Sequence, residues 1–573
     1  MKTAPQRKIW LIDSFIPPEV DSILVNYPSA FRQILYNRGY QNAESCESYL
    51  QACIPEGTEP YKMLGIPESV DRIRWAIAHN EAIAVYGDYD ADGVTATALL
   101  VKALRSLGAD AIPYIPNRFD EGYGLNREAL DNLSTQGKKL VITVDCGIRS
   151  LPEASHARSI GLDLIITDHH HPAHELPEAF AIINPKQPSD TYPDKDLAGV
   201  GLAYKLASAL ICTEEEVPPA NLGVDGYLDL VALGTVADLA PLTGENRALV
   251  RKGLEAIRRP QNQGIMALVG VAGLRPNQVT STHIGFALGP RLNAAGRLES
   301  ALAALNLLIT SDVAEAARLA QQLEIQNRER QQITRQIQEQ AELIALEEDS
   351  DALLLFAVHP EFNPGVVGLA ASRLCELYYR PSIVAHHGDI YTRGSCRSIP
   401  EFHITDALDQ CAELMEHHGG HAAAAGFTVR NENLSELVQR LKEIASQELA
   451  SQDLRPKLRA DLEIPLSQLK PDLLPYLDRL QPTGNGNRQV YFVSRDLKPV
   501  KASTVGRESN HLRLTLTDGR ITYDAIAFQQ GYWKDTLPGR IDILYQFEVN
   551  EYNGRLSLQL NVRDLKPSGM PDS

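Results

Sequence analysis

The stretch Ala82–Gly93, which reads AIAVYGDYDADG, sets the fold of the first half of the chain. Its apolar beginning, Ala82 to Tyr86, is short and partly β-branched, which is typical of a buried strand. An acidic run follows, and the residues from Ala91 to Leu107 then have the composition of a helix. Further short apolar segments alternate with helical stretches as far as about residue 240. The sequence therefore predicts an α/β fold built from βαβ units around a parallel sheet.

Three more acidic runs follow the first one in the same part of the chain. Two of them come directly after apolar segments, and all three are short: Val144-Asp145-Cys146-Gly147, Thr167-Asp168-His169-His170-His171 and Val236-Ala237-Asp238. Ligands of open α/β sheets gather outside the carboxyl ends of the strands, so we expect these runs to converge. Crowded carboxylates repel one another and require a cation, for which a pair of hard divalent metal ions is the simplest solution.

The first acidic run supplies three candidate metal ligands at alternate positions, Asp88, Asp90 and Asp92. On a strand they would share one face, and Gly93 would then permit a tight turn into the helix. We predict Asp90 and Asp92 as ligands, and we leave open whether Asp88 binds metal or supports a ligand. A calcium-binding EF-hand loop begins similarly, but it needs a Glu six residues after the Gly, where this chain has Leu99.

The second and third runs complete the predicted site. An Asp after a strand often only caps a helix, but the shared placement of the runs favours a metal role for Asp145. Three consecutive histidines cannot all face one metal ion, so we assign His169 as the ligand. The adjacent Asp168 would orient this ligand histidine, and His170 would contact a phosphate or transfer a proton. Carboxylates with one histidine favour Mn²⁺ or Mg²⁺ over zinc.

The last ligand is ambiguous between Asp229 and Asp238, which lie nine residues apart on one expected helix, Asp225 to Leu239. We prefer Asp238, because small and apolar residues flank it and Leu239-Ala240-Pro241 follows it.

The composition limits the class of protein. With 573 residues, 44% of them hydrophobic, the chain is long enough for three or four domains. Its seven cysteines are scattered without a C-x-x-C pair, which disfavours disulfides and thiolate zinc sites. The formal net charge of −18 is unfavourable for binding nucleic acid unless a local basic groove exists. No apolar run spans a membrane and no secretory signal opens the chain, so we expect a cytoplasmic protein.

The second half of the chain contains two further patterns. Asp312 to about Glu348 is almost free of Gly and Pro and predicts a helix of roughly 55 Å that connects two domains, with two shorter helices as the alternative. After about Pro456, alternating segments such as His511–Leu516, with turn signals at Asp518-Gly519 and Asn553-Gly554, predict a small β-barrel or sandwich.

These patterns predict six segments along the chain. In order, they are an N-terminal lead-in (1–75), a catalytic α/β domain (76–310), a connecting helix (311–350), a second α/β domain (351–450), a β-barrel domain (455–565) and a disordered tail (566–573).

Taken together, the motifs resemble the DHH phosphoesterase family, which takes its name from the triplet seen here at Asp168-His169-His170. The resemblance covers nearly the whole chain and rests also on four other motifs: Tyr86–Gly93, Gly289–Leu298, Gly419–Gly426 and Pro482–Asn487. It implies a DHH domain, a connecting helix, a DHH-associated domain and a C-terminal OB-fold. It also implies 5′→3′ degradation of single-stranded DNA to mononucleotides with Mn²⁺ or Mg²⁺, in DNA recombination and repair.

The resemblance also implies roles for individual residues. Asp90, Asp92, Asp145, His169 and Asp238 correspond to metal ligands, and Arg118, Arg297, Ser395 and Arg397 to groups that hold a 5′ phosphate. Arg291 lies in a similar setting of Asn and small residues, where a phosphate could approach. The alternative is that these arginines are solvated surface groups. The glycine-rich run around His421 resembles a nucleotide-binding segment, with tight helix packing as the alternative.

Two positions depart from the family pattern. Many members have a histidine where this chain has Tyr86, for which Asp88 is expected to compensate, and a proline is common where this chain has Arg488. The resemblance implies a 5′-ended single strand as substrate, a single-strand-binding protein and a helicase as partners, and a monomeric state. Two other functions remain open. One is a DHH enzyme for short oligonucleotides or cyclic dinucleotides, and the other is a non-catalytic scaffold, which the intact ligand set disfavours.

Overall fold

The computed structural model describes residues 7–117, 121–122, 124–212, 223–349, 351–552 and 555–572. The chain forms two compact units that interleave along the sequence. The sheet unit comprises Tyr49–Arg330 and Gln481–Arg488, and the barrel unit comprises Met1–Ser48, Gln331–Leu480 and Gln489–Ser573. None of the described helices combines the length and the apolar character that crossing a bilayer requires.

The sheet unit is built on a parallel sheet of five strands in the order β3-β2-β4-β5-β6. The strands are β2 (Ile83–Gly87), β3 (Ala111–Tyr114), β4 (Leu140–Val144), β5 (Asp163–Thr167) and β6 (Ala181–Ile183). Every residue of β2 and β4 is buried, because helices cover both faces of the sheet, and this explains their unbroken apolar sequence. The predicted parallel sheet is confirmed.

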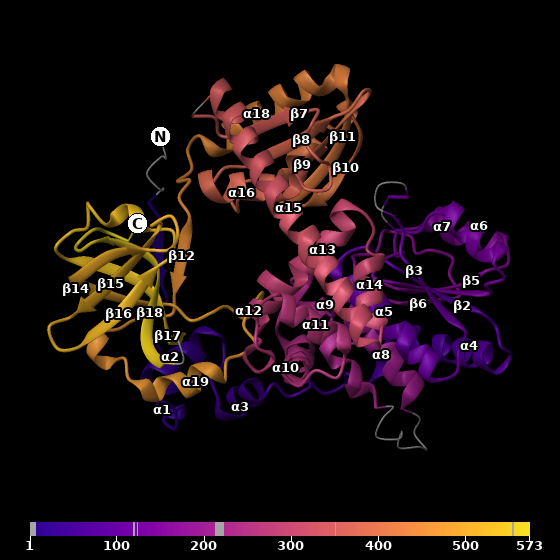
Figure 1. Cartoon of the computed structure of the whole chain (residues 1–573), viewed down its shortest axis with the longest axis horizontal. Coiled ribbons are helices and arrows are strands. Elements are labelled where there is room, and N and C mark those ends of the chain that lie inside the picture. Colours follow the sequence, from indigo (N-terminus) through magenta and orange to yellow (C-terminus); the bar gives the residue numbers. More distant parts are fainter. Residues whose placement is uncertain are drawn as a thin grey trace. The chain divides into compact units, whose positions relative to one another are not determined.

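Helices cover both faces of this sheet (Figure 1). On one face, α4 (Ile66–Ala78), α5 (Ala91–Ser106) and α8 (Gly199–Ile211) pack against alternate side chains of the strands. On the other face, α6 (Arg127–Thr135) and α7 (Leu151–Ser159) cover the remaining side chains. In the sheet, β3 lies on one side of β2, and β4, the next strand in the chain, lies on the other side of β2. A topological switch point therefore lies between β2 and β4.

A helical layer completes the sheet unit and continues the same hydrophobic core. Its helices are α9 (Leu228–Ala237), α10 (Gly244–Arg258), α11 (Gln263–Val271), α12 (Ser281–His283), the π-helix η4 (Ile284–Leu288), α13 (Gly289–Leu298) and α14 (Leu302–Ile309). All residues of helix α9 except the last, Ala237, are buried, which explains why its sequence is mostly apolar on all sides.

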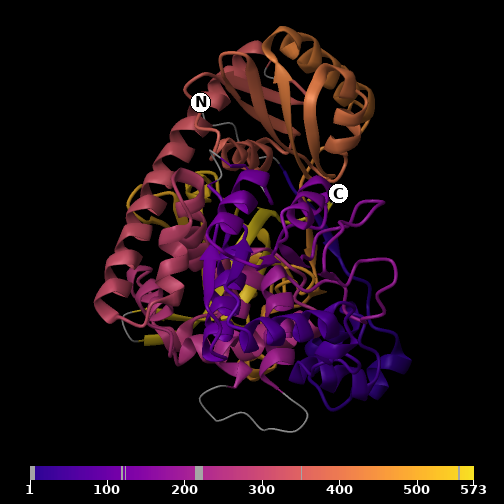
Figure 2. The same cartoon turned by 90° about the vertical axis from the view of Figure 1, so that its right-hand side faces the viewer.

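The predicted long helix is confirmed as one element, α15 (Val313–Glu348), of 36 residues. At 1.5 Å per residue it extends roughly 54 Å, and Figure 2 shows it along its length. The Asp312 side chain caps its first turn by accepting a hydrogen bond from the Glu315 backbone N–H at 2.7 Å.

The barrel unit contains a second, mixed sheet in the order β10-β11-β9-β8-β7. Its strands are β7 (Leu355–His359), β8 (Ser382–His387), β9 (Tyr391–Arg397), β10 (Met415–His421) and β11 (Ala424–Arg430). Helices α16 (Val367–Tyr378), α17 (Ile404–Asp409) and α18 (Leu434–Leu449) pack against it. This is the predicted second α/β region.

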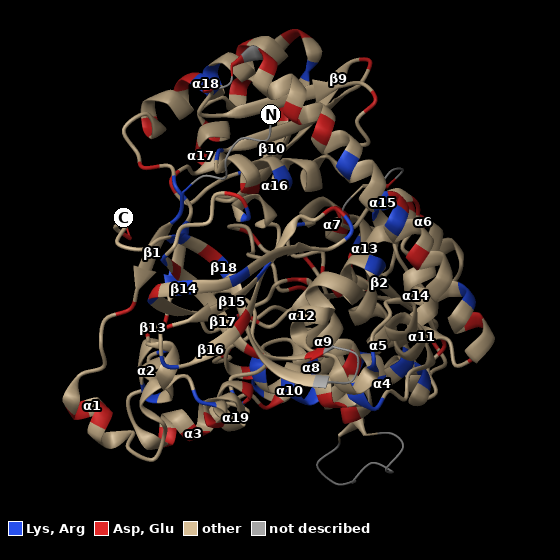
Figure 3. Cartoon of the chain, turned by 60° about the vertical axis from the view of Figure 1, so that its left-hand side comes forward, with Lys and Arg blue, Asp and Glu red and all other residues tan. Residues whose placement is uncertain are grey.

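The C-terminal strands close into a barrel, as predicted. The ring runs β14-β15-β16-β18-β17 and returns from β17 to β14, which is the five-stranded closure of an OB-fold. Its strands are β14 (Phe492–Val505), β15 (His511–Thr517), β16 (Thr522–Ala527), β17 (Ile541–Tyr552) and β18 (Arg555–Pro567). Lys and Arg are interspersed with Asp and Glu over the chain (Figure 3), so its negative net charge does not make it uniformly acidic.

The N-terminal residues form β1 (Ile9–Ile12), α1 (Pro18–Ile23), α2 (Ser29–Asn37) and α3 (Ala43–Gln51). Strand β1 pairs in parallel with β12 (Lys457–Ala460). The expected disorder of the C-terminal tail is not observed for its described part. The Asp572 carbonyl accepts a hydrogen bond from the Trp10 N–H at 2.9 Å, and the Asp572 carboxylate pairs with Arg495 at 2.7 Å. These partners lie far away in the sequence, so the composition of the tail did not indicate them.

Candidate active site

The predicted site residues meet at one edge of the sheet unit. Asp88 follows β2, Asp145 follows β4, and His169 follows β5. These strands are neighbours, with Gly87 beside Val144 and Val144 beside Thr167, so their carboxyl ends lie side by side. The C-terminal end of α9 brings Asp238 to the same place. The acidic runs therefore converge at the switch point, where α/β sheets bind ligands.

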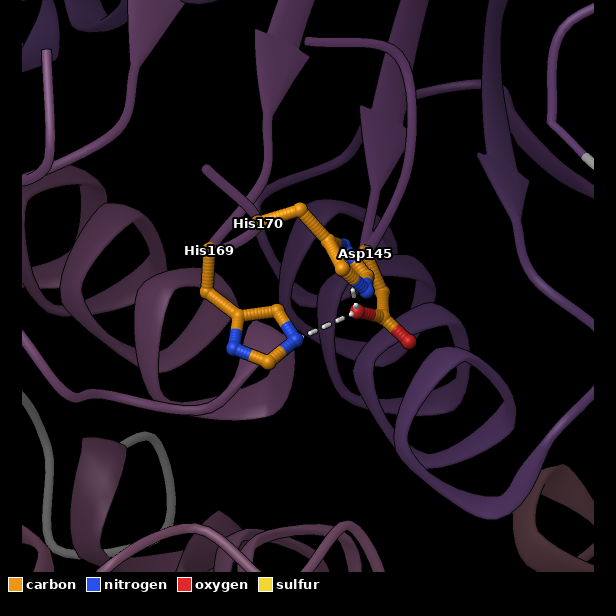
Figure 4. A group of neighbouring side chains, drawn as sticks. All are labelled: Asp145, His169 and His170. Atoms are coloured by element: carbon orange, nitrogen blue, oxygen red, sulfur yellow. Dashed lines mark ion pairs between the residues drawn. The ribbon is translucent and has the colours of Figure 1, made fainter. Parts of the chain in front are cut away.

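Within this cluster the side chains lie at metal-binding distances from one another. His169 Nε2 lies 3.1 Å from Asp145 Oδ1 and 3.8 Å from Asp238 Oδ2. Figure 4 shows His169 and His170 directed towards Asp145. Three overlapping groups each offer ligand atoms within 4.8 Å of one another: Asp145, His169 and His170; Asp92, His169 and Asp238; and Asp88, Asp90 and Asp145. All six predicted metal ligands belong to at least one group.

The first acidic run reaches the cluster by a different path from the one we predicted. The strand ends at Gly87, Asp90 is the N-cap of α5, and Asp92 lies in the first turn of that helix. The aspartates therefore do not share a strand face, and the prediction of an extended run was wrong. Gly93 has no unusual backbone angle, but a Cβ there would lie 2.5 Å from the Asp88 carbonyl oxygen. It is required because the chain folds closely onto itself.

Asp92 is held by the N-terminus of a second helix. Its two carboxylate oxygens accept hydrogen bonds from the backbone N–H groups of Gly199, at 2.7 Å, and Val200, at 2.8 Å, in the first turn of α8. The partial positive charge of a helix N-terminus stabilises a carboxylate in this position. The Asp92 side chain is 1% exposed, so both its orientation and its surroundings are fixed.

Helix α13 supports the same loop from another side. Asn293 Oδ1 accepts a hydrogen bond from the Ala91 N–H at 2.7 Å. A Cβ on Gly296 would lie 2.5 Å from the Tyr89 carbonyl oxygen. The motif at Gly289–Leu298, which we interpreted as a phosphate contact through its arginines, therefore also shapes the candidate metal-binding loop. The sequence drew attention to the motif but did not indicate this contact of Asn293.

Asp145 has a strained backbone. It is 2% exposed and adopts a left-handed conformation with φ of 64°, which is uncommon for a residue other than glycine. Strain of this kind is concentrated at functional sites, where the surrounding structure enforces it. In this conformation Asp145 Oδ1 lies close to His169 Nε2.

Asp168 does not belong to the three groups and instead holds His170. Its Oδ1 atom accepts hydrogen bonds from the N–H and the ring Nδ1 of His170, at 3.0 and 2.7 Å, and its Oδ2 atom accepts one from the Ile148 N–H at 2.9 Å. Because the carboxylate accepts this hydrogen bond, the ring Nδ1 of His170 carries a proton. Asp168 therefore orients His170 and not His169, the histidine that we assigned as the metal ligand.

Two residues that the sequence analysis missed hold the histidine loop. The Asn184 side chain donates to the His170 carbonyl at 2.9 Å, and the Lys186 ammonium donates to the His169 carbonyl at 2.7 Å. Both residues follow β6, the next strand of the sheet. Neither has a sequence signal of its own, although each follows the end of a strand as the acidic runs do.

Burial and mutual repulsion shift the pKa values of the clustered acids upwards. Burial raises the pKa of Asp145 well above its usual value, and the charges of Asp92, Asp90, Asp88 and Asp238 add to the effect. The pKa of Asp92 is raised in the same way by burial and by Asp238 and Asp90. Burial and the charge of Asp90 raise the pKa of Asp238 to about 7. The carboxylates are therefore difficult to ionise together without a cation.

The pKa values of His169 and His170 shift in opposite directions. Burial, together with the neighbouring His170, lowers the pKa of His169 to about 3, so this ring is neutral at pH 7 and can offer a lone pair. Burial also lowers the pKa of His170, but the hydrogen bond and charge of Asp168 outweigh it and raise the value overall. One histidine is thus suited to bind a metal ion and the other to hold a proton.

The residues present fit a divalent metal ion. Asp145 Oδ1 and His169 Nε2 are both fully buried and have no hydrogen-bond partner among the described residues. Such atoms are costly to bury unless they coordinate something. A cation between them would satisfy both atoms and would lower the pKa values of the surrounding acids.

The structure distinguishes between the two candidates for the last ligand, Asp238 and Asp229. Asp229 lies at the other end of α9, where its Oδ1 accepts a hydrogen bond from the Leu230 N–H at 2.7 Å. Burial raises its pKa to about 6, and the nearby Lys102 partly offsets this. Asp229 belongs to none of the three groups found among the described residues, whereas Asp238 does.

The predicted phosphate-binding arginines of the sheet unit have different surroundings. Arg118 lies outside the described residues. Arg291 is paired with Glu324 at 2.7 Å and donates to the Ala287 carbonyl at 2.8 Å, so its guanidinium already has protein partners. Arg297 lies in the last turn of α13, one residue beyond the Gly296 contact with the metal-binding loop. A phosphate contact of Arg291 or Arg297 stays a prediction.

In the barrel unit, Ser395 and Arg397 lie together on β9 beside the N-terminal turn of α16. The Arg397 guanidinium donates to Ser395 Oγ at 3.2 Å. A Cβ on Gly368, in the first turn of α16, would lie 2.8 Å from Ser395 Oγ and 3.2 Å from the Arg397 guanidinium. The three residues form what we call the Ser395–Arg397 corner. A hydroxyl, a guanidinium and a helix N-terminus are together suited to bind an anion.

His421 lies at the end of β10, in the hairpin that β10 makes with β11. The run Gly419–Gly426 is therefore extended, and the alternative of tight helix packing was wrong. Gly420 has φ of 150°, and a Cβ there would lie 2.4 Å from the Ala424 carbonyl oxygen across the hairpin. A nucleotide contact of His421, which is exposed, stays a prediction.

Family models match three parts of the chain. Residues 82–235 match the DHH family N-terminal domain, residues 351–447 match the DHHA1 domain, and residues 460–564 match the RecJ OB domain. The predicted resemblance to DHH phosphoesterases is thereby confirmed.

Curated relatives share most of this chain. The single-stranded-DNA-specific exonuclease RecJ of Escherichia coli (strain K12) is 35% identical over 96% of this chain and 98% of its own length. The chain belongs to the RecJ family. The RecJ of Bacillus subtilis (strain 168) is 38% identical over 93% of this chain and 67% of its own length.

Solved RecJ structures support this assignment and have metal ions bound. RecJ from Thermus thermophilus in complex with Mn²⁺ superimposes with a TM-score of 0.83, at 29% identity, over 98% of this chain and 80% of its own. Its complex with Mg²⁺ gives a TM-score of 0.77. These are the two metals that the carboxylate and histidine donor set favours.

Proposed function

We propose that this protein is a metal-dependent exonuclease that degrades single-stranded DNA from the 5′ end to 5′-mononucleotides, in DNA recombination and repair. The observation that carries the proposal is the convergence of six ligand side chains around His169 and Asp145, in a chain of the RecJ family. Relatives that share this chain over nearly its whole length are named single-stranded-DNA-specific exonucleases.

Two Mn²⁺ or Mg²⁺ ions held by Asp88, Asp90, Asp92, Asp145, His169 and Asp238 would supply a bound water of lowered pKa and would neutralise charge on the scissile phosphate. The protein contributes the rigidity of these groups. The α8 N-terminus fixes Asp92, and the Lys186 contact fixes the loop of His169. The hydrogen bond from the Asp145 N–H to the Thr167 carbonyl holds the strained backbone of Asp145. The ligands are therefore oriented before the substrate arrives, which saves reorganisation during the reaction.

His170 would hold a proton for the reaction. Asp168 binds its Nδ1 atom and favours the protonated ring. The Nε2 proton of such a ring can be donated to a phosphate oxygen or to the leaving oxygen of the cleaved bond. Asp168 thus acts by fixing the tautomer and orientation of His170 rather than by touching the substrate.

The polarity of degradation would come from binding of the terminal phosphate. The Ser395–Arg397 corner offers a hydroxyl, a guanidinium and a helix N-terminus to an anion. We assign it, with Arg118, Arg291 and Arg297, to contacts with the 5′ phosphate and the adjoining strand, and His421 to a nucleotide contact. The barrel, which matches the RecJ OB domain, would bind further nucleotides by base stacking and by contacts with the DNA backbone.

The same proposal includes the domain boundaries and the cellular setting. We propose domains at 76–310, 351–450 and 455–565, since each contains the residues that one family model matches. We further propose a monomer that acts in the cytoplasm, with a single-strand-binding protein and a helicase supplying its substrate.

A comparison of two substrates tests this function. A long single strand with a 5′ phosphate and a 3′ label should shorten progressively in Mn²⁺, whereas a dinucleotide should be a poor substrate. If only the dinucleotide is cleaved, the protein is a DHH enzyme for short substrates. If neither is cleaved in Mn²⁺ or Mg²⁺, the scaffold alternative gains support and the proposal fails.

A further inference from the structure

The segment Gln481–Arg488 forms a small hairpin that belongs to the sheet unit, although the residues on both sides of it belong to the barrel unit. Gly484 and Asn487 pair across the hairpin, and Gly486 adopts a left-handed φ of 69° in its turn. We call this segment the 481–488 hairpin. It contains the sequence motif Pro482–Asn487, which has no role in the proposed reaction.

The base of the hairpin is anchored to three separate parts of the sheet unit. The Tyr49 hydroxyl donates to Asn487 Oδ1 at 2.8 Å, and the Ser281 hydroxyl donates to the Thr483 carbonyl at 2.7 Å. The Arg247 guanidinium donates to the Pro482 carbonyl at 3.0 Å. Since Asn487 and Thr483 are buried, these bonds hold the hairpin in one orientation.

The tip of the hairpin contacts the loop that follows the metal-ligand candidate Asp238. Asn485 Nδ2 donates to the Leu239 carbonyl at 2.7 Å, and the Asn485 carbonyl accepts from the Leu242 N–H at 2.7 Å. A Cβ on Gly486 would lie 3.2 Å from Pro241 Cβ, so the two loops are in close contact. One asparagine therefore bonds to both ends of the segment Leu239–Leu242.

This segment needs support because of how α9 ends. The Leu239 N–H bonds to the Val236 carbonyl and the Ala240 N–H bonds to the Thr235 carbonyl, which is a Schellman motif with Asp238 at its C-cap. The motif requires a left-handed residue, usually glycine, directly after the cap. Here Leu239 fills that position, with φ of 63° and 68% of its surface exposed. Its own side chain gains little packing that could offset the strain.

We propose that Asn485 is a positioning residue for Asp238: it holds the strained Leu239 turn and thereby fixes the carboxylate of Asp238 for metal binding. This inference deepens the proposed function and rests on it. Without the Asn485 side chain, the turn at Leu239 relaxes towards an ordinary conformation and the last turn of α9 loosens. The metal ion should then bind less tightly, even before any DNA is present.

The test measures Mn²⁺ binding to the full chain without DNA, by the loss of the free-ion electron paramagnetic resonance signal. Loss of one hydrogen bond corresponds to about five-fold in an equilibrium constant. We therefore expect Asn485→Ala to weaken Mn²⁺ binding by about five-fold. Because Asn485 is exposed, the melting temperature measured in EDTA should stay close to that of the unmodified protein.

A second variant separates positioning from general stability. Leu239→Gly removes the cost of the left-handed turn, since glycine adopts this conformation readily. In the Asn485→Ala background it should restore most of the Mn²⁺ affinity, although it restores none of the lost hydrogen bond. By itself, Leu239→Gly should leave Mn²⁺ affinity unchanged.

A matched control removes another hydrogen bond of the same hairpin. Ser281→Ala deletes the bond to Thr483 but does not touch Leu239–Leu242, so Mn²⁺ affinity should not change. Asp238→Ala should weaken Mn²⁺ binding strongly; if it does not, the proposed metal site fails. If Asp238→Ala weakens binding but Asn485→Ala does not, or if Ser281→Ala weakens it equally, only the positioning role is overturned.

Discussion

The carboxylate cluster of the sheet unit and the Ser395–Arg397 corner of the barrel unit are built with opposite charge. The cluster gathers buried acids whose pKa values rise because of burial and because their charges repel one another. The corner places a guanidinium and a hydroxyl beside a helix N-terminus, and burial lowers the pKa of Arg397. One site is suited to bind cations and the other to bind an anion.

This difference indicates a division of labour. A metal cluster alone can hydrolyse a phosphodiester but cannot tell one end of a strand from the other. An anion site can recognise a terminal phosphate but cannot cleave. Substitutions in the cluster should therefore change the rate of hydrolysis, and substitutions in the corner should change which ends are cleaved.

The largest expected effect is that of His169→Ala. The variant loses a metal ligand, and since metal ions supply several kcal/mol of charge stabilisation, kcat should fall by at least about a thousand-fold. Far-ultraviolet circular dichroism should show that the fold persists. His171→Ala is the matched control, because His171 belongs to none of the ligand groups found among the described residues, and it should keep nearly full activity. Equal activity of the two variants in excess Mn²⁺ would contradict the metal assignment.

A smaller loss of activity is expected for Asp168→Ala, because Asp168 is not one of the proposed metal ligands. Asp168 belongs to none of the ligand groups found among the described residues, and its carboxylate binds His170, the proposed proton donor. Loss of a residue that orients a site histidine typically costs about 10–100-fold, and here the loss should appear in kcat. Mn²⁺ affinity, measured without DNA, should change much less. A variant with normal kcat and weakened Mn²⁺ binding would mean that Asp168 itself is a ligand.

Arg397→Ala should affect selectivity more than rate. A charge-assisted hydrogen bond contributes about 1.5–3 kcal/mol, so the preference for 5′-phosphate over 5′-hydroxyl ends should fall by about 10–100-fold. The measurement compares kcat/KM on matched strands with the two ends. Arg393→Ala controls for net charge, because Arg393 lies on the same strand but is exposed and about 13 Å away. Unchanged discrimination in Arg397→Ala would remove the corner from end recognition.

The smallest effect on activity is expected for Asp229→Asn, a buried acid outside the cluster. Activity should change by less than about two-fold, since Asp229 is bonded at the opposite end of α9 from Asp238. Stability should change with pH instead. The folded pKa of about 6 lies above the usual 3.8, so the folded state binds more protons between these values.

The Asp229 carboxyl therefore costs stability as pH rises from 4 to 7, by up to about 3 kcal/mol. Asp229→Asn should lose this contribution, which denaturant unfolding at pH 4 and pH 7 would measure as a difference from the unmodified protein. A large loss of hydrolysis in Asp229→Asn would reopen the choice between Asp229 and Asp238.

The sequence predicted the convergence of the acidic runs, because apolar segments that end in acids must place those acids at one edge of a parallel sheet. It also predicted the long helix, from a stretch almost free of Gly and Pro, and the barrel, from short alternating segments with turn signals between them. It did not predict the path of Asp88 to Asp92, since a strand that ends at Gly87 and a helix that begins at Ala91 leave no room for an extended run.

The sequence also did not predict contacts between distant parts of the chain. Three contacts join residues that are far apart in the sequence. They are the contacts of Asn293 with Ala91, of Asn485 with Leu239, and of Asp572 with Arg495. A single sequence contains no local signal for such contacts. They depend on the folded backbone bringing two loops together.

The central claim is that the cluster around Asp145 and His169 hydrolyses a single strand from its 5′ end. The most direct measurement follows a 3′-labelled, 5′-phosphorylated single strand with Mn²⁺, for the unmodified protein and for His169→Ala. The account predicts a ladder of steadily shorter labelled fragments and released mononucleotides for the unmodified protein, and an intact strand for the variant. Release of the labelled 3′ nucleotide at the earliest times, or equal degradation by the variant, would contradict it.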